Sequence, residues 1–328
     1  MRRTFYASTL ALIFAAFAAA SAQAQSAATS LPLPASDAYL TLDVHTLFAE
    51  VIPRSLASDK ARLAQVNADV EEFKARTGID AREFDTLAVG ARIVALPSGA
   101  TKLDRVTAVA RGRFKPETLV AAARAAAKGG LAEQTHGGKT VYVAAVNDQL
   151  KLFGLAKMRV KDLAFAVLDQ NTLALGEPED VRAAIDAQAG RGRADMSMLN
   201  FPRGAGDFLA FAGNVPAGAL AGVKTDISPS VDRAIASVRG FYGTVGSTAA
   251  GAQLMTTLRA GTASDAKQLY DVVNALRQLA PGFISMAGAK WGFARGLVDG
   301  MKLTTKGNEV QLRLEVPQAD IATVLKSL

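Results

Sequence analysis

The C-terminal stretch Met301–Leu328, MKLTTKGNEVQLRLEVPQADIATVLKSL, decides the fold. Apolar and polar residues alternate on both sides of Gly307-Asn308, which predicts a β-hairpin with one apolar and one polar face. Pro317 then stands where a helix can begin. The apolar residues beyond it share one helical face: Ile321, Val324 and Leu325. The stretch therefore predicts two antiparallel strands followed by a short helix.

The same module occurs earlier in the chain. Leu163–Leu168 and Thr172–Leu175 flank a polar turn, and Pro178 opens a helix. Both alternating residue sets of Leu163–Leu168 are apolar, which predicts a central strand covered on both sides. We interpret the recurrence as an internal duplication, with repeats at residues 37–189 and 207–328 and a basic Gly-rich linker at 190–206. The predicted fold class is α+β, with antiparallel sheets and helices on one face.

Two helices outside these modules have clear periodicity. Leu63, Val66, Val70 and Phe73 predict the helix Asp59–Arg76, with Ser58 as N-cap and Gly78 as terminator. The other predicted helix runs over Ser264–Leu279, where Ser264 has the position of an N-cap and Pro281-Gly282 ends the helix.

The N-terminus has the form of an export signal. Arg2-Arg3 is followed by the apolar stretch Leu10–Ala20 and by Ala22-Gln23-Ala24, which predicts a signal peptide at residues 1–24 with cleavage near Ala24. Residues 25–36 are small, polar and Pro-containing, and we expect a flexible tether. The arginine pair fits the general secretory route and also the twin-arginine route, of which the first is favoured. No later stretch is apolar for long enough to form a transmembrane anchor. A periplasmic or secreted protein is expected.

Composition excludes several classes of site. The chain has 328 residues, no cysteine and a net charge of +7. The lack of cysteine rules out disulfides, thiolate metal sites and cysteine nucleophiles. The positive charge is compatible with anionic surroundings and equally with a merely basic protein. Because basic residues do not alternate with aromatic ones on one face, we expect no nucleic-acid partner.

The motifs that resemble catalytic ones are incomplete. Gly138-Lys139-Thr140 lacks the upstream glycine of a phosphate-binding loop and precedes a strand. Ser264 and Lys267 have the Ser-x-x-Lys spacing of penicillin-recognising enzymes, without the further motifs of that family. His45 and His136 stand far apart, and His136 lies in a glycine turn where we expect it to be solvated. We therefore predict no catalytic residue, no cofactor and no metal.

Two basic amphipathic stretches, 150–161 and 283–298, combine apolar residues with lysine or arginine. Such a pattern suits an anionic amphiphile or a membrane surface, and it suits equally a lid that packs onto the protein's own core. The candidate ligand-binding residues are Phe153, Lys157, Met158, Lys290, Trp291, Phe293 and Arg295.

Three segments carry a resemblance to known proteins: Phe84–Gly90, Ala110–Phe114 and Gly307–Leu312, together with the opening Ser36–Leu40. They resemble exported acidobacterial-type envelope proteins of unknown function. The resemblance covers most of the chain after the leader and implies export and a repeated α+β fold. It brings no activity and no site residues.

The function favoured by these patterns is that of a non-enzymatic exported binding or scaffold protein of the bacterial envelope, for an amphiphilic or anionic ligand. One alternative is a periplasmic hydrolase with a dispersed serine or carboxylate site. Another is a structural partner of a second envelope protein.

Overall fold

The computed structural model describes residues 31–96, 101–127, 130–152, 156–225, 227–287 and 293–327. Within these ranges the chain forms two compact units. The N-terminal unit comprises the described parts of Ala22–Arg92 and Asp104–Asn200, and the C-terminal unit those of Ile93–Leu103 and Phe201–Leu328. The predicted signal peptide lies outside the described residues, and the internal duplication stays a prediction.

The N-terminal unit is built on antiparallel strands in the order β1-β2-β3-β7-β6-β5-β4. Their bounds are β1 Ala38–Asp43, β2 Phe84–Ala95, β3 Thr101–Gly112, β4 Leu131–His136, β5 Lys139–Leu152, β6 Ala156–Asp169 and β7 Thr172–Gly176. The helical segments are α3 Val44–Thr46, η1 Leu47–Val51, α4 Ile52–Ser55, α5 Lys60–Thr77, η2 Ala81–Glu83, α6 Pro116–Ala126, α7 Pro178–Gln188 and η3 Ser197–Leu199.

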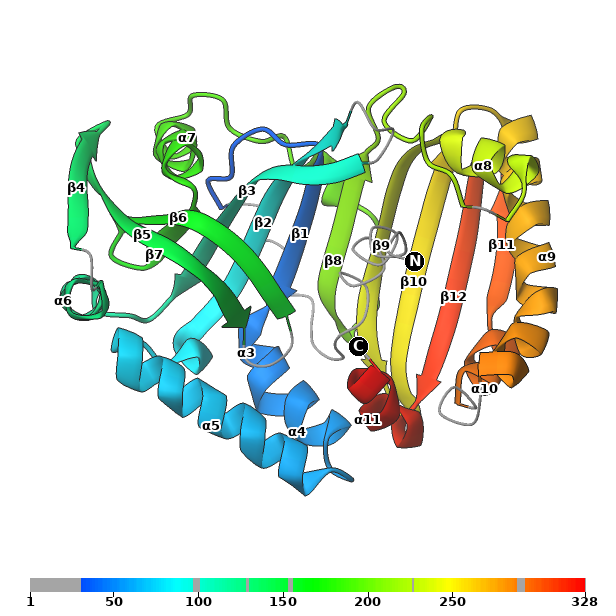
Figure 1. Ribbon diagram of the computed structural model, residues 1–328, viewed down its shortest axis with the longest axis horizontal. Coiled ribbons are helices and arrows are strands. Elements are labelled where there is room, and N and C mark those ends of the chain that lie inside the picture. Colours follow the sequence, from blue (N-terminus) through cyan, green and yellow to red (C-terminus); the bar gives the residue numbers. More distant parts are fainter. Residues whose placement is uncertain are drawn as a thin grey trace. The chain divides into compact units, whose positions relative to one another are not determined.

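The C-terminal unit has antiparallel strands in the order β11-β12-β10-β9-β8. The strands are β8 Asp207–Asn214, β9 Val238–Thr248, β10 Gly251–Ala260, β11 Lys302–Lys306 and β12 Glu309–Pro317. The helices are α8 Pro229–Ala236, α9 Ala263–Ala287, α10 Phe293–Asp299 and α11 Gln318–Ser327. In Figure 1, α9 runs beside β11, and α11 lies at the end of β10 and β12. The predicted α+β class with antiparallel sheets is confirmed.

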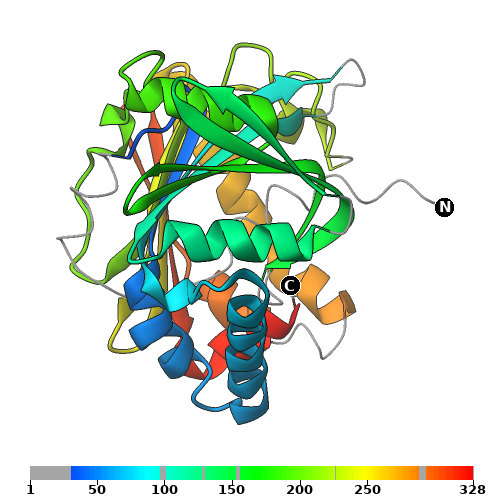
Figure 2. The same ribbon diagram turned by 90° about the vertical axis from the view of Figure 1, so that its left-hand side faces the viewer.

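Both hairpin–helix modules are present. β6, β7 and α7 form the first, and β11, β12 and α11 form the second. In β6, Phe165 packs into an apolar cluster with Leu119 of α6, while Ala164 and Ala166 on the opposite face are fully buried. The predicted central strand with two covered faces is therefore confirmed. Figure 2 shows α6 on the side of the N-terminal unit that faces the viewer.

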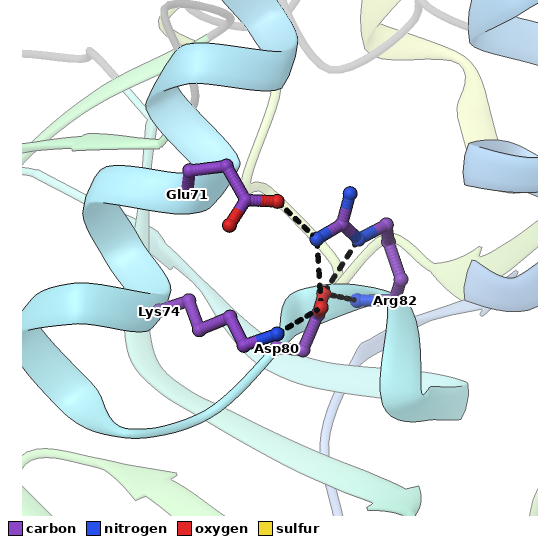
Figure 3. Close-up of polar contacts among 4 residues, drawn as sticks. All are labelled: Glu71, Lys74, Asp80 and Arg82. Atoms are coloured by element: carbon purple, nitrogen blue, oxygen red, sulfur yellow. Dashed lines mark hydrogen bonds and ion pairs between the residues drawn. The ribbon is translucent and has the colours of Figure 1, made fainter.

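A polar cluster joins the end of α5 to η2 (Figure 3). Gly78 ends α5 in the left-handed region with φ of 69°, a conformation that glycine adopts without steric cost. Asp80 then accepts bonds from the backbone N (3.0 Å) and Nε (2.7 Å) of Arg82 and from Nζ of Lys74 (3.2 Å). Glu71 of α5 also binds Arg82. These bonds, the one from the Arg82 side chain above all, hold the pKa of Asp80 well below its usual range although burial opposes the shift.

Several predicted boundaries were wrong. Asp59, and not Ser58, caps α5, because its carboxylate accepts from the backbone N of Arg62 at 3.1 Å. In the expected tether, Leu31 and Leu33 are buried in the N-terminal unit, where Pro34 forms a bridge with Arg193. Apolar burial at two alternate residues thus orders residues 31–36 despite their composition.

The helix expected to stop before Pro281 continues through it. α9 extends to Ala287 with Pro281 inside. A proline inside a helix removes one backbone hydrogen bond, and α9 continues past Pro281 without it.

Candidate ligand-binding site

One face of the C-terminal sheet is mostly apolar, with Thr256 opposite Leu312 as a polar exception. The strand registers pair Leu258 with Val310, Leu254 with Leu314, and Ala252 with Val316. Since side chains alternate across a strand, these paired residues lie on a single face of β10 and β12. The apolar alternation predicted for the C-terminal hairpin is thereby confirmed, with Gln311, Arg313 and Glu315 exposed on the other face.

Burial along this apolar face is uneven. At one end, Val310 is 2% exposed and packs with Val238, with Ala234 of α8 and with Leu269 of α9. Toward the other end, Leu312, Leu314 and Val316 of β12 are only partly buried. Their neighbour Leu254 of β10 is only partly buried as well. We call this second part the open end of the apolar face.

Helices lie over the open end without sealing it. We define the helical cover as residues 277–287 of α9 together with α10 and α11. α10 contacts α9 and β12, and α11 contacts β10 and β12. In the first turns of α9, Ala266 and Leu269 are buried, whereas Leu279 is 58% and Met286 77% exposed farther along. The cover therefore leaves two large apolar side chains, Leu279 and Met286, exposed to solvent.

Polar contacts fasten the cover at both α11 and α9. The backbone N of Gln318 in α11 donates to the carbonyl of Ala250 at 2.9 Å. Nη1 of Arg277 donates to the carbonyl of Met301 at 2.9 Å, which ties α9 to the residue before β11. The hydroxyl of Ser285 donates to the carbonyl of Pro281 at 2.8 Å, a bond within α9 itself. Gly282 and Gly296 have no atom within 4 Å of the place where a Cβ would stand. Loosely held helices with glycine in their interior open at lower free-energy cost than well-packed ones.

The opposite face of the same sheet is polar and internally satisfied. The hydroxyl of Tyr242 donates to Glu309 at 3.0 Å, and Arg259 binds the same carboxylate at 3.2 Å. Arg259 also lies over the Tyr242 ring, 5.8 Å from its centroid. Burial raises the pKa of Tyr242, so this phenol stays protonated and donates. The contrast between the faces places the candidate site on the apolar one.

The two basic stretches differ in secondary structure: the first forms strands and the second forms helices where they are described. Residues 150–161 continue β5 and β6, where Leu150 pairs with Met158 and Lys151 with Lys157, so the first stretch is strand where it is described. The second stretch comprises the end of α9 and α10, with Phe293 as the first residue of α10 and Arg295 exposed upon it. Phe153, Lys290 and Trp291 lie outside the described residues, as do the side chains of Lys157, Met158 and Phe293. The predicted site stays a prediction.

Met286 belongs to the predicted stretch 283–298, whereas Leu254, Leu279 and Leu314 were not predicted as site residues. The alternation in β10 and β12 did predict an apolar face for the strand residues. No local pattern, however, distinguishes a sealed part of such a face from an open one, because that depends on how the helices pack across the strands.

The motifs with catalytic spacing are not assembled for catalysis. Nζ of Lys267 lies 3.0 Å from the carboxylate of Asp271 in the following turn of α9. Ser264, one turn before Lys267, is exposed. His136 is not a solvated turn residue: its Nε2 lies 3.0 Å from Asp186 of α7, which also binds Arg191. Gly137 and Gly138 form the tight turn between β4 and β5, with φ of 54° and 75°. In the described ranges, no three His, Asp or Glu residues gather closely enough to hold a metal ion.

Comparisons with known proteins add little. Neither a family model nor a curated protein matches the sequence. Among solved structures, crystal form I of TP0453 is similar with a TM-score of 0.46 and 9% identity over 91% of this chain and 97% of that chain. Crystal form III of TP0453 is similar with a TM-score of 0.47 and 10% identity, over 91% of this chain and 98% of that chain. No helix in the described part of this chain combines the length and hydropathy needed to cross a membrane.

Proposed function

We propose that the chain is a non-enzymatic exported binding protein of the bacterial envelope that holds the alkyl part of an anionic amphiphile. The binding surface is the open end of the apolar face, and the helical cover moves to admit the ligand. The observation that carries the proposal is the difference in burial between Val310 and its neighbours Leu312, Leu314 and Val316 on one strand face.

The physical chemistry favours an alkyl chain. Each CH₂ group removed from water contributes about 0.8 kcal/mol, so a chain that completes the burial of these side chains gains stability in proportion to its length. The exposed cation Arg295 of α10 belongs to the cover and suits an anionic head group. The exposed Leu279 and Met286 give the outer side of the cover an apolar surface that can meet a lipid layer.

Trp291, the sole tryptophan, stands in the sequence between α9 and α10 and serves as the fluorescent probe. The chain without residues 1–24 is titrated with oleate and with a dibrominated stearate while tryptophan fluorescence is followed. Both ligands should compete for one site, and the brominated chain should quench the emission. Native mass spectrometry of protein from an expressing bacterium should show a bound amphiphile.

A pair of variants assigns the site. Leu314→Gln places an amide on the open end and should weaken binding at least tenfold. Gln311→Ala changes the polar face of the same strand and should leave affinity unchanged. An absence of quenching by the brominated chain would overturn the proposal, and equal affinity of Leu314→Gln and wild type would remove the open end as the site.

A second function, that of a structural partner of another envelope protein, is favoured by the exposure of Leu279 and Met286 on one helix. The double variant Leu279→Ser and Met286→Ser separates the two functions. It should retain amphiphile binding while losing any protein that cross-links to α9 in cells. Retention of the cross-linked protein would exclude this surface as the contact.

A further inference from the structure

A second candidate site lies in the N-terminal unit, between α6 and the strands that follow it. The groove there has a volume of about 440 Å³ and is lined from one side by α6 and from the other by the start of β5 and by β6. This volume falls within the range of small-molecule sites, roughly 300–1,000 Å³. We call it the α6 groove.

The floor of the α6 groove is apolar and firmly supported. Val120 of α6 and Val167 of β6 line it, together with the ring of Tyr142. That ring stacks on Phe165 with centroids 4.9 Å apart and planes inclined by 18°. Phe165 is itself buried. A floor held in this way offers a preformed surface to an apolar side chain.

Three charged side chains line the groove, and they differ in their partners. Arg124 is bound to Glu133 at 2.5 Å, so its charge is offset. Glu117 of α6 and the partly buried Lys139 of β5 form no ion pair with any residue in the described ranges, nor with each other. The groove thus presents one unpaired anion and one unpaired cation on different elements.

This charge arrangement selects among ligand classes. A simple anion would gain from Lys139 but meet repulsion from Glu117, and a simple cation would meet the reverse. A ligand that carries both charges satisfies both side chains at once. Because the floor is apolar, such a ligand also gains from an apolar substituent.

We propose that the α6 groove binds a small zwitterion with an apolar side chain, of which a free apolar amino acid and a short apolar peptide are the two sources. The ammonium group lies toward Glu117, the carboxylate toward Lys139, and the side chain rests on Val120, Val167 and Tyr142. This site is independent of the amphiphile site, since it belongs to the other unit and to another ligand class.

Calorimetric titration tests the proposal with leucine, dileucine and three analogues that remove charge. Isovalerate keeps only the carboxylate, isoamylamine only the ammonium, and N-acetyl-leucinamide neither. At least one zwitterion should bind, and each analogue should bind at least tenfold more weakly. The comparison of leucine with dileucine identifies the source.

Charge exchange across the groove provides the control. Glu117→Lys and Lys139→Glu should each lose at least tenfold in affinity, whereas the double exchange restores the pair of unlike charges and should recover most of it. Lys306→Gln, at an exposed cation in the C-terminal unit, should leave the affinity for the zwitterion unchanged. Circular dichroism checks that each variant is folded.

Three results would overturn the site. These are no binding of either zwitterion, equal binding of isovalerate and leucine, or a double exchange as weak as the single variants. None of them bears on the amphiphile site, whose readout is the quenching of tryptophan fluorescence by the brominated chain.

Discussion

Thr262 and Asp265 cap the first turn of α9 reciprocally. The backbone N of Asp265 donates to Oγ1 of Thr262 at 3.1 Å, and that hydroxyl donates to Oδ2 of Asp265 at 2.8 Å. This geometry satisfies one of the free N–H groups that every helix start leaves. The sequence pattern assigned the cap to Ser264, which is exposed within the first turn and accepts none of these bonds.

Replacing Thr262 and replacing Ser264 should therefore have different effects on the free energy of unfolding. Thr262→Ala should lower the free energy of unfolding by about 0.5–2 kcal/mol, the usual cost of a lost N-cap. Ser264→Ala should stay within about 0.5 kcal/mol of wild type, as surface substitutions do. Urea denaturation followed by circular dichroism measures both. A larger loss for Ser264→Ala than for Thr262→Ala would contradict the observed cap.

The Asp80 cluster predicts an acid-sensitive contribution to stability. The bond from Arg82 lowers the pKa of Asp80 in the folded state relative to the unfolded chain. Between these two values the unfolded chain binds more protons, so the contribution is present above the ordinary carboxyl pKa of about 4 and is lost as pH falls through the folded value. Asp80→Asn should reduce stability at pH 7 and reduce the further loss on acidification.

Urea denaturation at pH 7, 4 and 3 measures this effect. Asp85→Asn, at an exposed position of the neighbouring strand β2, serves as the control and should follow the wild-type pH dependence. If Asp80→Asn loses as much stability between pH 7 and pH 3 as wild type does, the carboxylate of Asp80 makes no acid-sensitive contribution.

Glycines in the helical cover offer a way to stiffen it. Gly282 and Gly296 stand inside α9 and α10 with open space where a Cβ would be. Alanine at each position should stabilise the protein by about 0.5–1 kcal/mol, because glycine loses more backbone entropy in a helix. If the cover opens to admit an amphiphile, the double variant should also bind the brominated chain more slowly in stopped-flow fluorescence. An unchanged association rate would mean that the ligand enters without movement of α9 and α10.

Alanine at Gly243 of β9 should destabilise the protein, in contrast to alanine at Gly282 or Gly296. A Cβ there would stand 2.1 Å from the carbonyl of Met255 and 2.5 Å from the ring of Phe211. The backbone of β10 cannot yield without breaking the sheet register, so Gly243→Ala should lower stability by about 1–3 kcal/mol or more. A thermal melt compares it with Gly282→Ala. A melting temperature equal to that of wild type would show that β9 and β10 can separate at this point.

Local patterns were sufficient for much of the fold. The alternation around Gly307-Asn308 predicted β11 and β12, and Pro178 and Pro317 marked where a helix follows a hairpin. These signals are reliable because side-chain alternation and the fixed φ of proline act on a few adjacent residues. The glycine turn at Gly137-Gly138 was predicted on the same grounds.

Longer-range packing decided what these patterns could not. Tertiary burial orders Leu33 in a segment with the composition of a tether. It also pairs His136, the last residue of β4, with Asp186 of α7. Each outcome depends on contacts with residues distant in sequence.

The sequence by itself determined the alternating strands, the turns and an apolar face for β12, because each depends on the order of neighbouring residues. Only the tertiary structure decided that one end of this face is sealed by α8 and α9 while Leu312 and Leu314 remain partly open. The reason is physical: burial is set by the distance and angle at which helices cross the sheet, and these follow from packing over the whole unit.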